Sequence, residues 1–370
     1  MSTKNLIDTA TQISVLIIGV QTPHNKTFDV ESYFQEFKNL VATSGIVPAE
    51  EVYTKLRTID HSYFFTKGKL NELISLCEQK HFDEIIISEP LSTQQARNLK
   101  DALNAPIVDR TELILRIFEQ GAQSAEGKVQ VEMAILKFQK SRLAGYGIHL
   151  SQQGGTIGTK GPGETAKEKA TQHLERSITQ TRKELDQLEK VRITQRKRRL
   201  ESKTPHIGIV GYTNAGKSTL LNTLTNSNIL AENKLFATLD TTTRELFLNG
   251  TKKGTISDTV GFIQNLPHSL VAAFKSTLSE LQYALLLLLV VDISDKNWRN
   301  HISVVEDTLT EIGAGGIPKI FVFNKLDQTK LTPEQKNEIA LQFSPAVFIS
   351  ARDKDKIEEL TSLLESWKPA

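Results

Sequence analysis

Short apolar runs and helically spaced apolar positions take turns along the first 125 residues. Ile13–Val20 has the length of a buried strand, whereas Val30–Thr43 repeats its apolar residues with a helical period. Ser92, followed by Gln95, predicts a capping box that opens a helix ending near Leu103. The predicted strands are Ile13–Val20, Glu51–Ile59, Glu84–Ile87 and Ile107–Val108, and the remaining predicted helices are Lys69–Gln79 and Thr111–Glu119. This alternation predicts an N-terminal α/β domain over residues 1–125, with a small and mostly parallel sheet.

The pattern changes over residues 126–203. One helical face is formed by Val131, Ile135, Phe138 and Arg142, and a long charged helix is predicted from about Glu164 to Leu200. Between the two helices, Gly145–Gly163 holds seven glycines in nineteen residues, a density that argues against any regular element. We interpret this region as a helical hairpin with a glycine-rich tip. The tip is either a long unstructured turn or a backbone-rich probe that enters a tight RNA pocket.

Positive charge on the long helix gathers at its C-terminal end. Residues 164–201 contain eleven Lys and Arg against seven Asp and Glu, and the cluster consists of Arg192, Arg196, Lys197, Arg198 and Arg199. A solvated helix face whose charge suits the helix dipole is one interpretation. Contact with a phosphate backbone is the other.

Residues 204–370 form a third region, in which predicted strands end at polar motifs. Apolar runs at His206–Val210, Ala284–Val291 and Ile320–Phe323 predict buried strands, and Ile357–Trp367 predicts a closing amphipathic helix. The alternation predicts a doubly wound, mostly parallel sheet of the P-loop NTPase type, which is the fold of a G domain. The predicted fold class of the whole chain is therefore α/β, with a long helical hairpin between two α/β domains.

The first of these motifs is a P-loop, which follows a predicted strand and opens a predicted helix. Its residues are Gly211, Tyr212, Thr213, Asn214, Ala215, Gly216, Lys217, Ser218 and Thr219. Backbone N–H groups of such a loop wrap phosphates, Lys217 would neutralise the β- and γ-phosphate oxygens, and Ser218 would ligate Mg²⁺. The motif predicts a nucleoside triphosphatase.

A second motif, Asp258-Thr259-Val260-Gly261, follows the predicted strand Gly254–Ser257. At this distance from a P-loop, its carboxylate would reach Mg²⁺ through water and the Gly261 N–H would meet the γ-phosphate. The threonine-rich loop between the two motifs, Phe236-Ala237-Thr238-Leu239-Asp240-Thr241-Thr242-Thr243-Arg244, would form the first switch. One of its four threonines would complete the Mg²⁺ shell, and spacing alone does not choose among them.

Base selectivity is predicted by a third motif, Asn324-Lys325-Leu326-Asp327, after the apolar strand Ile320–Phe323. The Asp327 carboxylate would accept hydrogen bonds from N1–H and the amino group of guanine, which adenine does not offer. Ser350-Ala351, after the predicted strand Val347–Ile349, adds a backbone N–H for the guanine carbonyl. Together these motifs predict a protein that binds GTP and hydrolyses it to GDP and phosphate.

Two positions in these motifs bear on the hydrolysis rate. Phe262 stands after Gly261, where many regulatory GTPases have a glutamine that orients water. A phenyl ring lacks that capacity, so we expect slow intrinsic hydrolysis or a group from a partner. Asn214 either helps to hold a potassium ion beside the phosphates or braces the loop.

Composition limits the remaining interpretations. The 370 residues carry a net charge of +2, so any contact with nucleic acid must come from a local cluster. A single cysteine, Cys77, excludes an intramolecular disulfide and a cysteine-based metal site. No apolar run approaches the roughly 18 residues of a membrane span, and the N-terminus has no targeting pattern. We expect a cytoplasmic monomer without stable membrane insertion.

These motifs together resemble the HflX family of ribosome-associated GTPases, within the Obg–HflX group of translation GTPases. The specific matches are Glu126–Glu132 and Gln153–Thr165 in the middle region, GYTNAGKST at 211–219, FATLD at 236–240, DTVGFIQNLP at 258–267 and NKLD at 324–327. The resemblance implies that Thr238 is the switch threonine that ligates Mg²⁺ together with Ser218. It also implies that Lys217, Thr238 and Gly261 serve catalysis, and that a hydrophobic residue belongs at Phe262.

The resemblance further implies binding to the large ribosomal subunit and its RNA, stimulation of hydrolysis there, and splitting or rescue of stalled or idle ribosomes under stress. A ribosome-assembly GTPase and a GTP-gated RNA-binding module with slow hydrolysis are the alternatives. The residues predicted to contact the nucleotide are the P-loop residues 211–219, Phe236, Ala237, Thr238, Leu239, Asp240, Asp258, Thr259, Val260, Gly261, Asn324, Lys325, Leu326, Asp327, Ser350 and Ala351.

Overall fold

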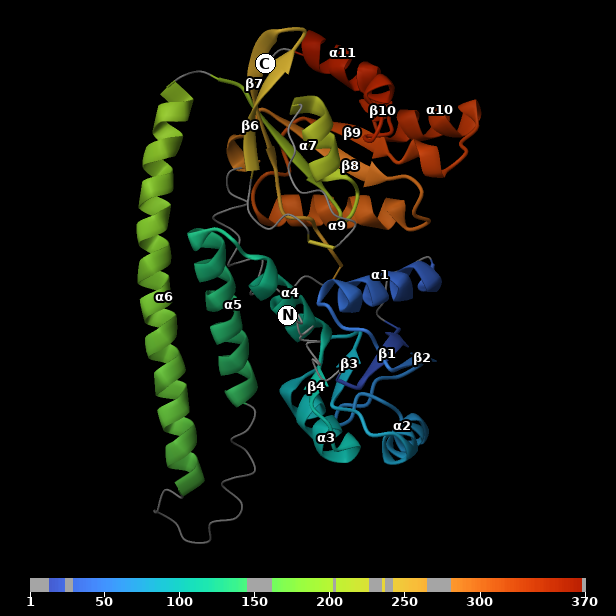
Figure 1. The fold of residues 1–370 in the computed structure, drawn as a ribbon, viewed down its shortest axis with the longest axis vertical. Helices are drawn as coiled ribbons and strands as arrows, with labels where there is room; N and C mark the ends of the chain where they lie inside the picture. Colours follow the sequence, from blue (N-terminus) through green and yellow to red (C-terminus); the bar gives the residue numbers. More distant parts are fainter. Residues whose placement is uncertain are drawn as a thin grey trace, which may run out of the picture. The chain divides into compact units, whose positions relative to one another are not determined.

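The structure is a computed structural model of the 370-residue chain. It describes residues 13–23, 29–144, 162–201, 204–225, 235–236, 242–264 and 281–367 (Figure 1). The chain divides into two compact units. The first comprises Met1–Asn25 and Leu40–Ile114, and the second comprises Lys26–Asn39 and Leu115–Ala370.

The first unit is built around a parallel four-stranded sheet in the order β2-β1-β3-β4. Its strands are β1 (Val15–Gln21), β2 (Glu50–Lys55), β3 (Glu84–Ile87) and β4 (Ile107–Val108). The alternate residues Leu16, Ile18 and Val20 of the central strand are fully buried and pack in one apolar cluster with Leu73 and Leu99. Because β1 and β3 are covered on both faces, their apolar runs are continuous, as the sequence predicts.

Helices α2 (Lys67–Gln79) and α3 (Thr93–Leu103) supply the apolar side chains that cover this sheet. The predicted capping box is confirmed, since Ser92 Oγ accepts from the Gln95 N–H and Gln95 Oε1 accepts from the Ser92 N–H. The predicted strand Glu51–Ile59 is too long. It ends at Lys55, opposite Gln21, the last residue of its partner β1, and the Asp60 carboxylate later accepts the N–H groups of Ser62 and Tyr63 in a turn. Helices α1 (Val30–Thr43) and α4 (Arg110–Gly121) each begin in one unit and end in the other.

In the second unit, α5 (Ala125–Ala144) and α6 (Pro162–Glu201) run side by side (Figure 1). The Lys140 ammonium and the Glu175 carboxylate join them at 2.9 Å. The two predicted helices of the hairpin are therefore present. Gly163 belongs to α6, because a glycine in the first turn of a helix is easily tolerated. The rest of the glycine-rich passage, residues 145–161, lies outside the described residues.

A six-stranded sheet in the order β10-β9-β8-β5-β7-β6 forms the core of the same unit. Only β6 runs antiparallel to its neighbour. The strands are β5 (His206–Gly211), β6 (Thr242–Leu248), β7 (Thr251–Asp258), β8 (Leu286–Asp292), β9 (Lys319–Asn324) and β10 (Ala346–Phe348). Strands β6 and β7 lie on one side of β5 and strands β8 to β10 on the other, so the carboxyl ends of β5 and β8 form the crevice where such sheets bind ligands.

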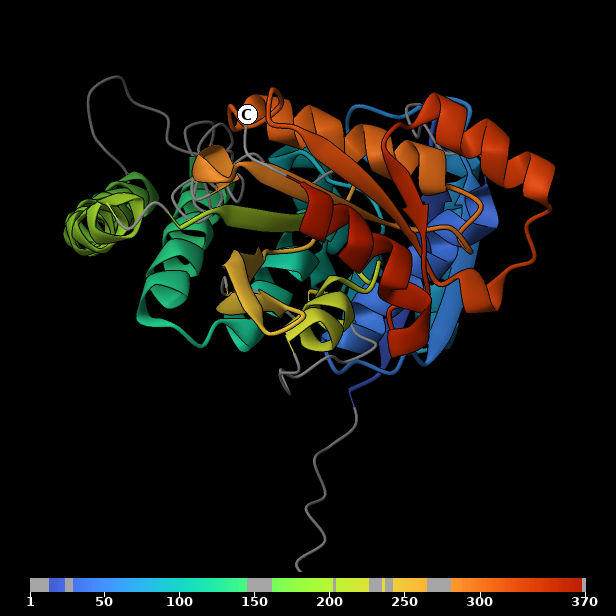
Figure 2. The same cartoon turned by 90° about the horizontal axis from the view of Figure 1, so that it is seen from above.

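Helices cover both faces of this sheet (Figure 2). One face packs against α7 (Lys217–Thr225) and α11 (Glu358–Ser366), whose leucines join Ile209 and Leu288 in one buried cluster. The other face packs against α9 (Trp298–Glu311), where the Trp298 ring meets Phe323 edge-on at 5.4 Å. A short helix, α10 (Pro333–Gln342), and the 3₁₀ turns η2 (Leu281–Tyr283), η3 (Leu326–Gln328) and η4 (Lys354–Ile357) complete the unit. Among the described residues, no helix is long and apolar enough to cross a membrane.

Candidate nucleotide-binding site

The P-loop lies where the sequence predicts it, between the end of β5 at Gly211 and the start of α7 at Lys217. The Lys217 side chain is buried, and its ammonium donates to the Tyr212 carbonyl at 2.9 Å. Burial lowers the pKa of Lys217 to about 8, and the nearby Asp258 carboxylate only partly opposes that shift. A lysine desolvated in this way gains more than an exposed one from a phosphate at the same place.

An oxygen group from a helix and one from a strand meet beside this lysine. Parallel pairing of β5 with β7 places Asp258 opposite Ile209, at the carboxyl end of both strands. The Ser218 hydroxyl, on the first turn of α7, donates to Asp258 Oδ2 at 2.5 Å. Thr259 Oγ1 donates to the Ile209 carbonyl at 2.8 Å and holds the turn after β7.

Gly261 passes close to the P-loop. A Cβ at this position would lie 2.9 Å from Lys217 Nζ and 2.9 Å from Thr213 Cγ2, so only glycine fits. The next residue, Phe262, bonds back to the loop twice, through its N–H to the Gly211 carbonyl at 3.1 Å and its carbonyl to the Thr213 N–H at 2.7 Å. Its side chain is buried, with 2% of its surface exposed.

Asn324 joins the base motif to the P-loop. Its amide nitrogen donates to the Ala215 carbonyl at 2.8 Å, and its amide oxygen accepts from the Ala351 N–H at 2.8 Å. Gly216 has φ +95° and leaves room for this amide, since a Cβ there would lie 2.3 Å from Asn324 Nδ2. One side chain therefore ties together three motifs that are far apart in the sequence.

The Asp327 carboxylate is held in position by a neighbouring side chain. The Ser350 hydroxyl donates to Asp327 Oδ1 at 2.7 Å, and this bond is the main cause that holds the pKa of Asp327 below its usual value. Lys325 has a left-handed φ of 62°, and its ammonium pairs with Asp292 at the end of β8 at 2.7 Å. The pairing of β8 with β9, with Asp292 opposite Asn324, accounts for that contact.

The P-loop, the base motif at residues 324–327 and the pair Ser350-Ala351 line one cavity of about 420 Å³. Its lining residues are Asn214, Gly216, Thr219, Asn324, Lys325, Asp327, Gln328, Ser350, Ala351 and Arg352. Eight of them were predicted from the sequence. Gln328 and Arg352 were missed, although each directly follows a predicted motif, and that adjacency is the signal that could have found them. Leu326 belongs to the adjoining turn η3.

The first switch is only partly described. Phe236 is buried, and its ring packs against Phe118 with centroids 4.6 Å apart. Ala237, Thr238, Leu239 and Asp240 lie outside the described residues, so the choice of Thr238 among the four threonines stays a prediction. The potassium hypothesis for Asn214 also stays a prediction.

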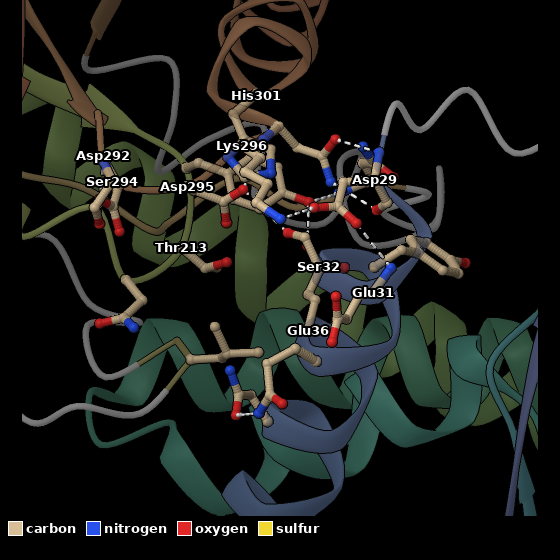
Figure 3. A pocket seen from close by; sticks show the side chains of 18 residues that line it. Asp29, Glu31, Ser32, Glu36, Thr213, Asp292, Ser294, Asp295, Lys296 and His301 are labelled. Atoms are coloured by element: carbon tan, nitrogen blue, oxygen red, sulfur yellow. Dashed lines mark hydrogen bonds and ion pairs between the residues drawn. The ribbon is translucent and has the colours of Figure 1, made fainter. Parts of the chain in front are cut away.

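A second cavity of about 420 Å³ lies beside the P-loop, within the same compact unit. Residues of the segment 29–39 line one side of it. Figure 3 shows Asp29 and Ser32 of this segment facing Asp295 and Lys296, with an ion pair of 3.2 Å between Lys296 and Asp29. The sequence did not predict this neighbourhood, because no local pattern links two segments more than 250 residues apart.

Three family models match the chain in succession. They are described as "GTP-binding GTPase N-terminal" over residues 31–119, "GTP-binding GTPase Middle Region" over 121–199 and "50S ribosome-binding GTPase" over 206–325. A protein named GTPase HflX from Caldanaerobacter subterraneus subsp. tengcongensis is 42% identical over 352 residues, which cover 95% of this chain and 79% of that protein. This chain belongs to the HflX family of GTPases.

Other comparisons agree with that membership. The GTPase HflX of Escherichia coli is 42% identical over 79% of this chain and 69% of its own length. The crystal structure of a GTP-binding protein from Sulfolobus solfataricus, in complex with GDP, superimposes with a TM-score of 0.50 over 95% of this chain and 100% of that one. Its identity is 24%, so this likeness supports the fold alone. The HflX family membership makes this chain a GTP-binding protein and a GTP hydrolase.

The depressed pKa of Lys217 leads to a prediction about proton uptake. In the free protein the lysine loses its proton above about pH 8, whereas a bound diphosphate would keep it protonated to higher pH. GDP binding is therefore expected to take up most of one proton at about pH 8.5 and little at about pH 7. Calorimetry in two buffers of different ionisation enthalpy measures this uptake. Lys217→Arg, which stays charged throughout, is the control, and equal uptake by both proteins would contradict the role of Lys217.

Proposed function

We propose that this HflX family GTPase binds GTP and Mg²⁺ at the P-loop, hydrolyses GTP on the large ribosomal subunit, and splits or rescues stalled or idle ribosomes. The observation that carries the proposal is the buried Phe262 in place of a water-orienting side chain. An enzyme built this way needs a partner to align the attacking water. The family model named "50S ribosome-binding GTPase", matched over residues 206–325, points to the large subunit as that partner.

Each motif has a separate role in the proposed reaction. Lys217 neutralises charge on the β- and γ-phosphates, and the Gly261 N–H meets the γ-phosphate. Among the described residues, the buried hydroxyl of Thr213 has no hydrogen-bond partner, and a phosphate oxygen would provide an acceptor. Asp327 accepts N1–H and the amino group of guanine, and the Ala351 N–H would exchange its present acceptor, Asn324 Oδ1, for the guanine carbonyl. Water then attacks the γ-phosphorus, and GDP and phosphate leave.

The residues around Ser218 fit Mg²⁺. A hydroxyl and a carboxylate oxygen lie 2.5 Å apart at the mouth of the P-loop, and hard oxygen donors are the ligands that Mg²⁺ prefers. Ser218 and Thr238 would hold the ion directly, and Asp258 would hold it through water. Bound there, Mg²⁺ would neutralise phosphate charge, while the chain itself orients the nucleotide.

The hairpin suits the proposed partner in length and charge. Helix α6 has 40 residues, which correspond to about 60 Å at about 1.5 Å per residue. Its sequence ends in the basic run Arg196–Arg199, and a helix of this length can span a large RNA surface. We propose that the glycine-rich residues at the other end of α6 enter ribosomal RNA.

The proposal predicts that purified large subunits raise the rate of GTP hydrolysis by at least about tenfold, the effect of lowering the barrier by about 1.4 kcal/mol. A steady-state assay of the full chain, with and without large subunits, measures it. Small subunits alone serve as the control. An unchanged rate at saturating large subunits would contradict the proposal.

Charge variants and a sedimentation assay distinguish the competing roles. Changing Arg196, Lys197, Arg198 and Arg199 to glutamine is expected to weaken ribosome binding and reduce its dependence on salt. The matched control removes the same charge from the exposed α6 residues Lys169, Arg176, Arg182 and Lys183. Loss of intact ribosomes in a gradient with a non-hydrolysable GTP analogue supports splitting, whereas precursor particles that accumulate on deletion would indicate an assembly role.

A further inference from the structure

The side chain of the P-loop residue Tyr212 makes its contacts outside the P-loop. Its carbonyl accepts from the ammonium of Lys217, but its ring is stacked on His301 of α9, with centroids 3.8 Å apart and planes 10° apart. Both side chains are buried, and burial is the main cause that lowers the pKa of His301, which favours the neutral imidazole. The stack therefore fixes the direction of the Tyr212 phenol relative to the P-loop.

The phenolic oxygen of Tyr212 makes two hydrogen bonds at once. It donates to Glu36 Oε2 at 2.5 Å and accepts from the backbone N–H of Gln264 at 2.9 Å. A carboxylate acceptor strengthens the first bond, and successive hydrogen bonds polarise one another. Glu36, Tyr212 and Gln264 therefore form a short chain of bonds, all within the second compact unit.

This chain of bonds ends on the backbone that follows Gly261. Gln264 lies three residues after Gly261 and two after Phe262, whose own N–H and carbonyl are already bonded to the P-loop. The hydrogen bond from the Gln264 N–H to the Tyr212 phenol is a third bond between this segment and the P-loop. It lies where the segment leaves the P-loop. Gly261 packs against the P-loop too tightly for a Cβ, and the Gln264 N–H is bonded to Tyr212 three residues further along the same backbone.

We propose that Tyr212 is a positioning residue for GTP hydrolysis and that Glu36 positions Tyr212 in turn. The phenol holds the Gln264 backbone, and through it the Gly261 N–H, in the orientation required at the γ-phosphate. With Phe262 unable to orient water, the rate depends on this backbone alignment more than it would in a GTPase with glutamine there.

Tyr212→Phe is the direct test, because it removes one oxygen atom and leaves the stack on His301. Single-turnover GTP hydrolysis by the full chain is expected to slow about three- to tenfold, the effect of one hydrogen bond on the barrier. The dissociation constant of GDP is expected to change by less than about twofold, since the P-loop backbone is unaltered. A hydrolysis rate equal to that of the unmodified chain would overturn the proposal, and so would a loss of GDP affinity as large as the loss of rate.

Tyr53→Phe is the matched control. Tyr53 also donates its hydroxyl to a carboxylate, Glu51 Oε2 at 3.0 Å, but it lies in the first unit on β2 and is 38% exposed. The same oxygen is removed and the same kind of acceptor is left, away from the P-loop. Hydrolysis and GDP binding are expected to match the unmodified chain, and a slowing equal to that of Tyr212→Phe would overturn the proposal.

Variants at Glu36 separate positioning from folding. Glu36→Ala is expected to slow hydrolysis like Tyr212→Phe, whereas Glu36→Gln keeps an amide oxygen for the phenol and retains most of the rate. The double variant Tyr212→Phe with Glu36→Ala should be no slower than either single one, because both act through one bond chain. Additive losses, or a failure of Glu36→Gln to rescue, would overturn the proposal. These assays contain no ribosomes, so their outcome is independent of the ribosomal role.

Discussion

Lys217→Ala is expected to abolish measurable GTP turnover and to weaken GTP binding by about 2–5 kcal/mol, or roughly 30- to 4,000-fold. The lysine is buried beside Asp258, so the phosphates would lose a desolvated positive charge and retain a carboxylate as neighbour. Equilibrium binding of a fluorescent GTP analogue and a phosphate-release assay measure the two effects.

The fold is expected to survive Lys217→Ala. Burial disfavours the charged lysine in the free protein, so the variant should unfold at no lower temperature than the unmodified chain. Lys319→Ala is the matched control. Lys319 is the first residue of β9, at the opposite end of the strand from Asn324, and its ammonium pairs with the Glu306 carboxylate at 3.0 Å. It has no part in the nucleotide site. Normal hydrolysis by Lys217→Ala would refute the proposed role of the P-loop lysine.

Asp327→Asn is expected to exchange the base preference from guanine to xanthine. An amide presents N–H donors where the carboxylate accepts, so it opposes the amino group of guanine and suits the carbonyl of xanthine. We expect GTP affinity to fall by about 2–4 kcal/mol, about 30- to 1,000-fold, and xanthosine triphosphate affinity to rise. The Ser350 hydroxyl still finds an acceptor in the new side chain, so the local structure should persist.

Competition between GTP and xanthosine triphosphate measures this exchange directly. Asp307→Asn, an exposed position on α9, makes the same chemical change away from the cavity and should leave the preference unchanged. An unchanged preference for GTP in Asp327→Asn would mean that the guanine base is recognised elsewhere.

Local patterns predicted most of the elements correctly. The capping box at Ser92 and the strand Glu84–Ile87 were placed to the residue, because both depend on interactions within a few positions of the chain. The strand predicted to reach Ile59 was too long, since the alternation of side chains continues to Ile59 whereas the partner strand β1 ends opposite Lys55. A periodic pattern indicates which face a residue would occupy, but it does not mark where pairing with a neighbouring strand stops.

The nucleotide site was also largely predictable. Its motifs follow successive strands, and the carboxyl ends of parallel strands meet at one edge of a sheet. The order of the motifs therefore implied that Lys217, Asp258 and Asp327 would converge. The sequence did not predict that the amide of Asn324 links the P-loop to Ser350-Ala351 through its bonds to Ala215 and Ala351. Each of these bonds depends on the spacing of three packed segments.

By itself, the sequence determined the GTPase class of this protein. The residues that recognise phosphate and guanine stand in short contiguous motifs, and these motifs and the strands beside them can be identified from a few neighbouring positions. Only the tertiary structure decided what surrounds Tyr212. Its partners Glu36, Gln264 and His301 come from an early helix, the loop after β7 and α9, and their hydrogen bonds depend on side-chain geometry. The physical reason is that a phenol bonds to whatever groups packing brings within about 3 Å, and no periodicity in the chain records that distance.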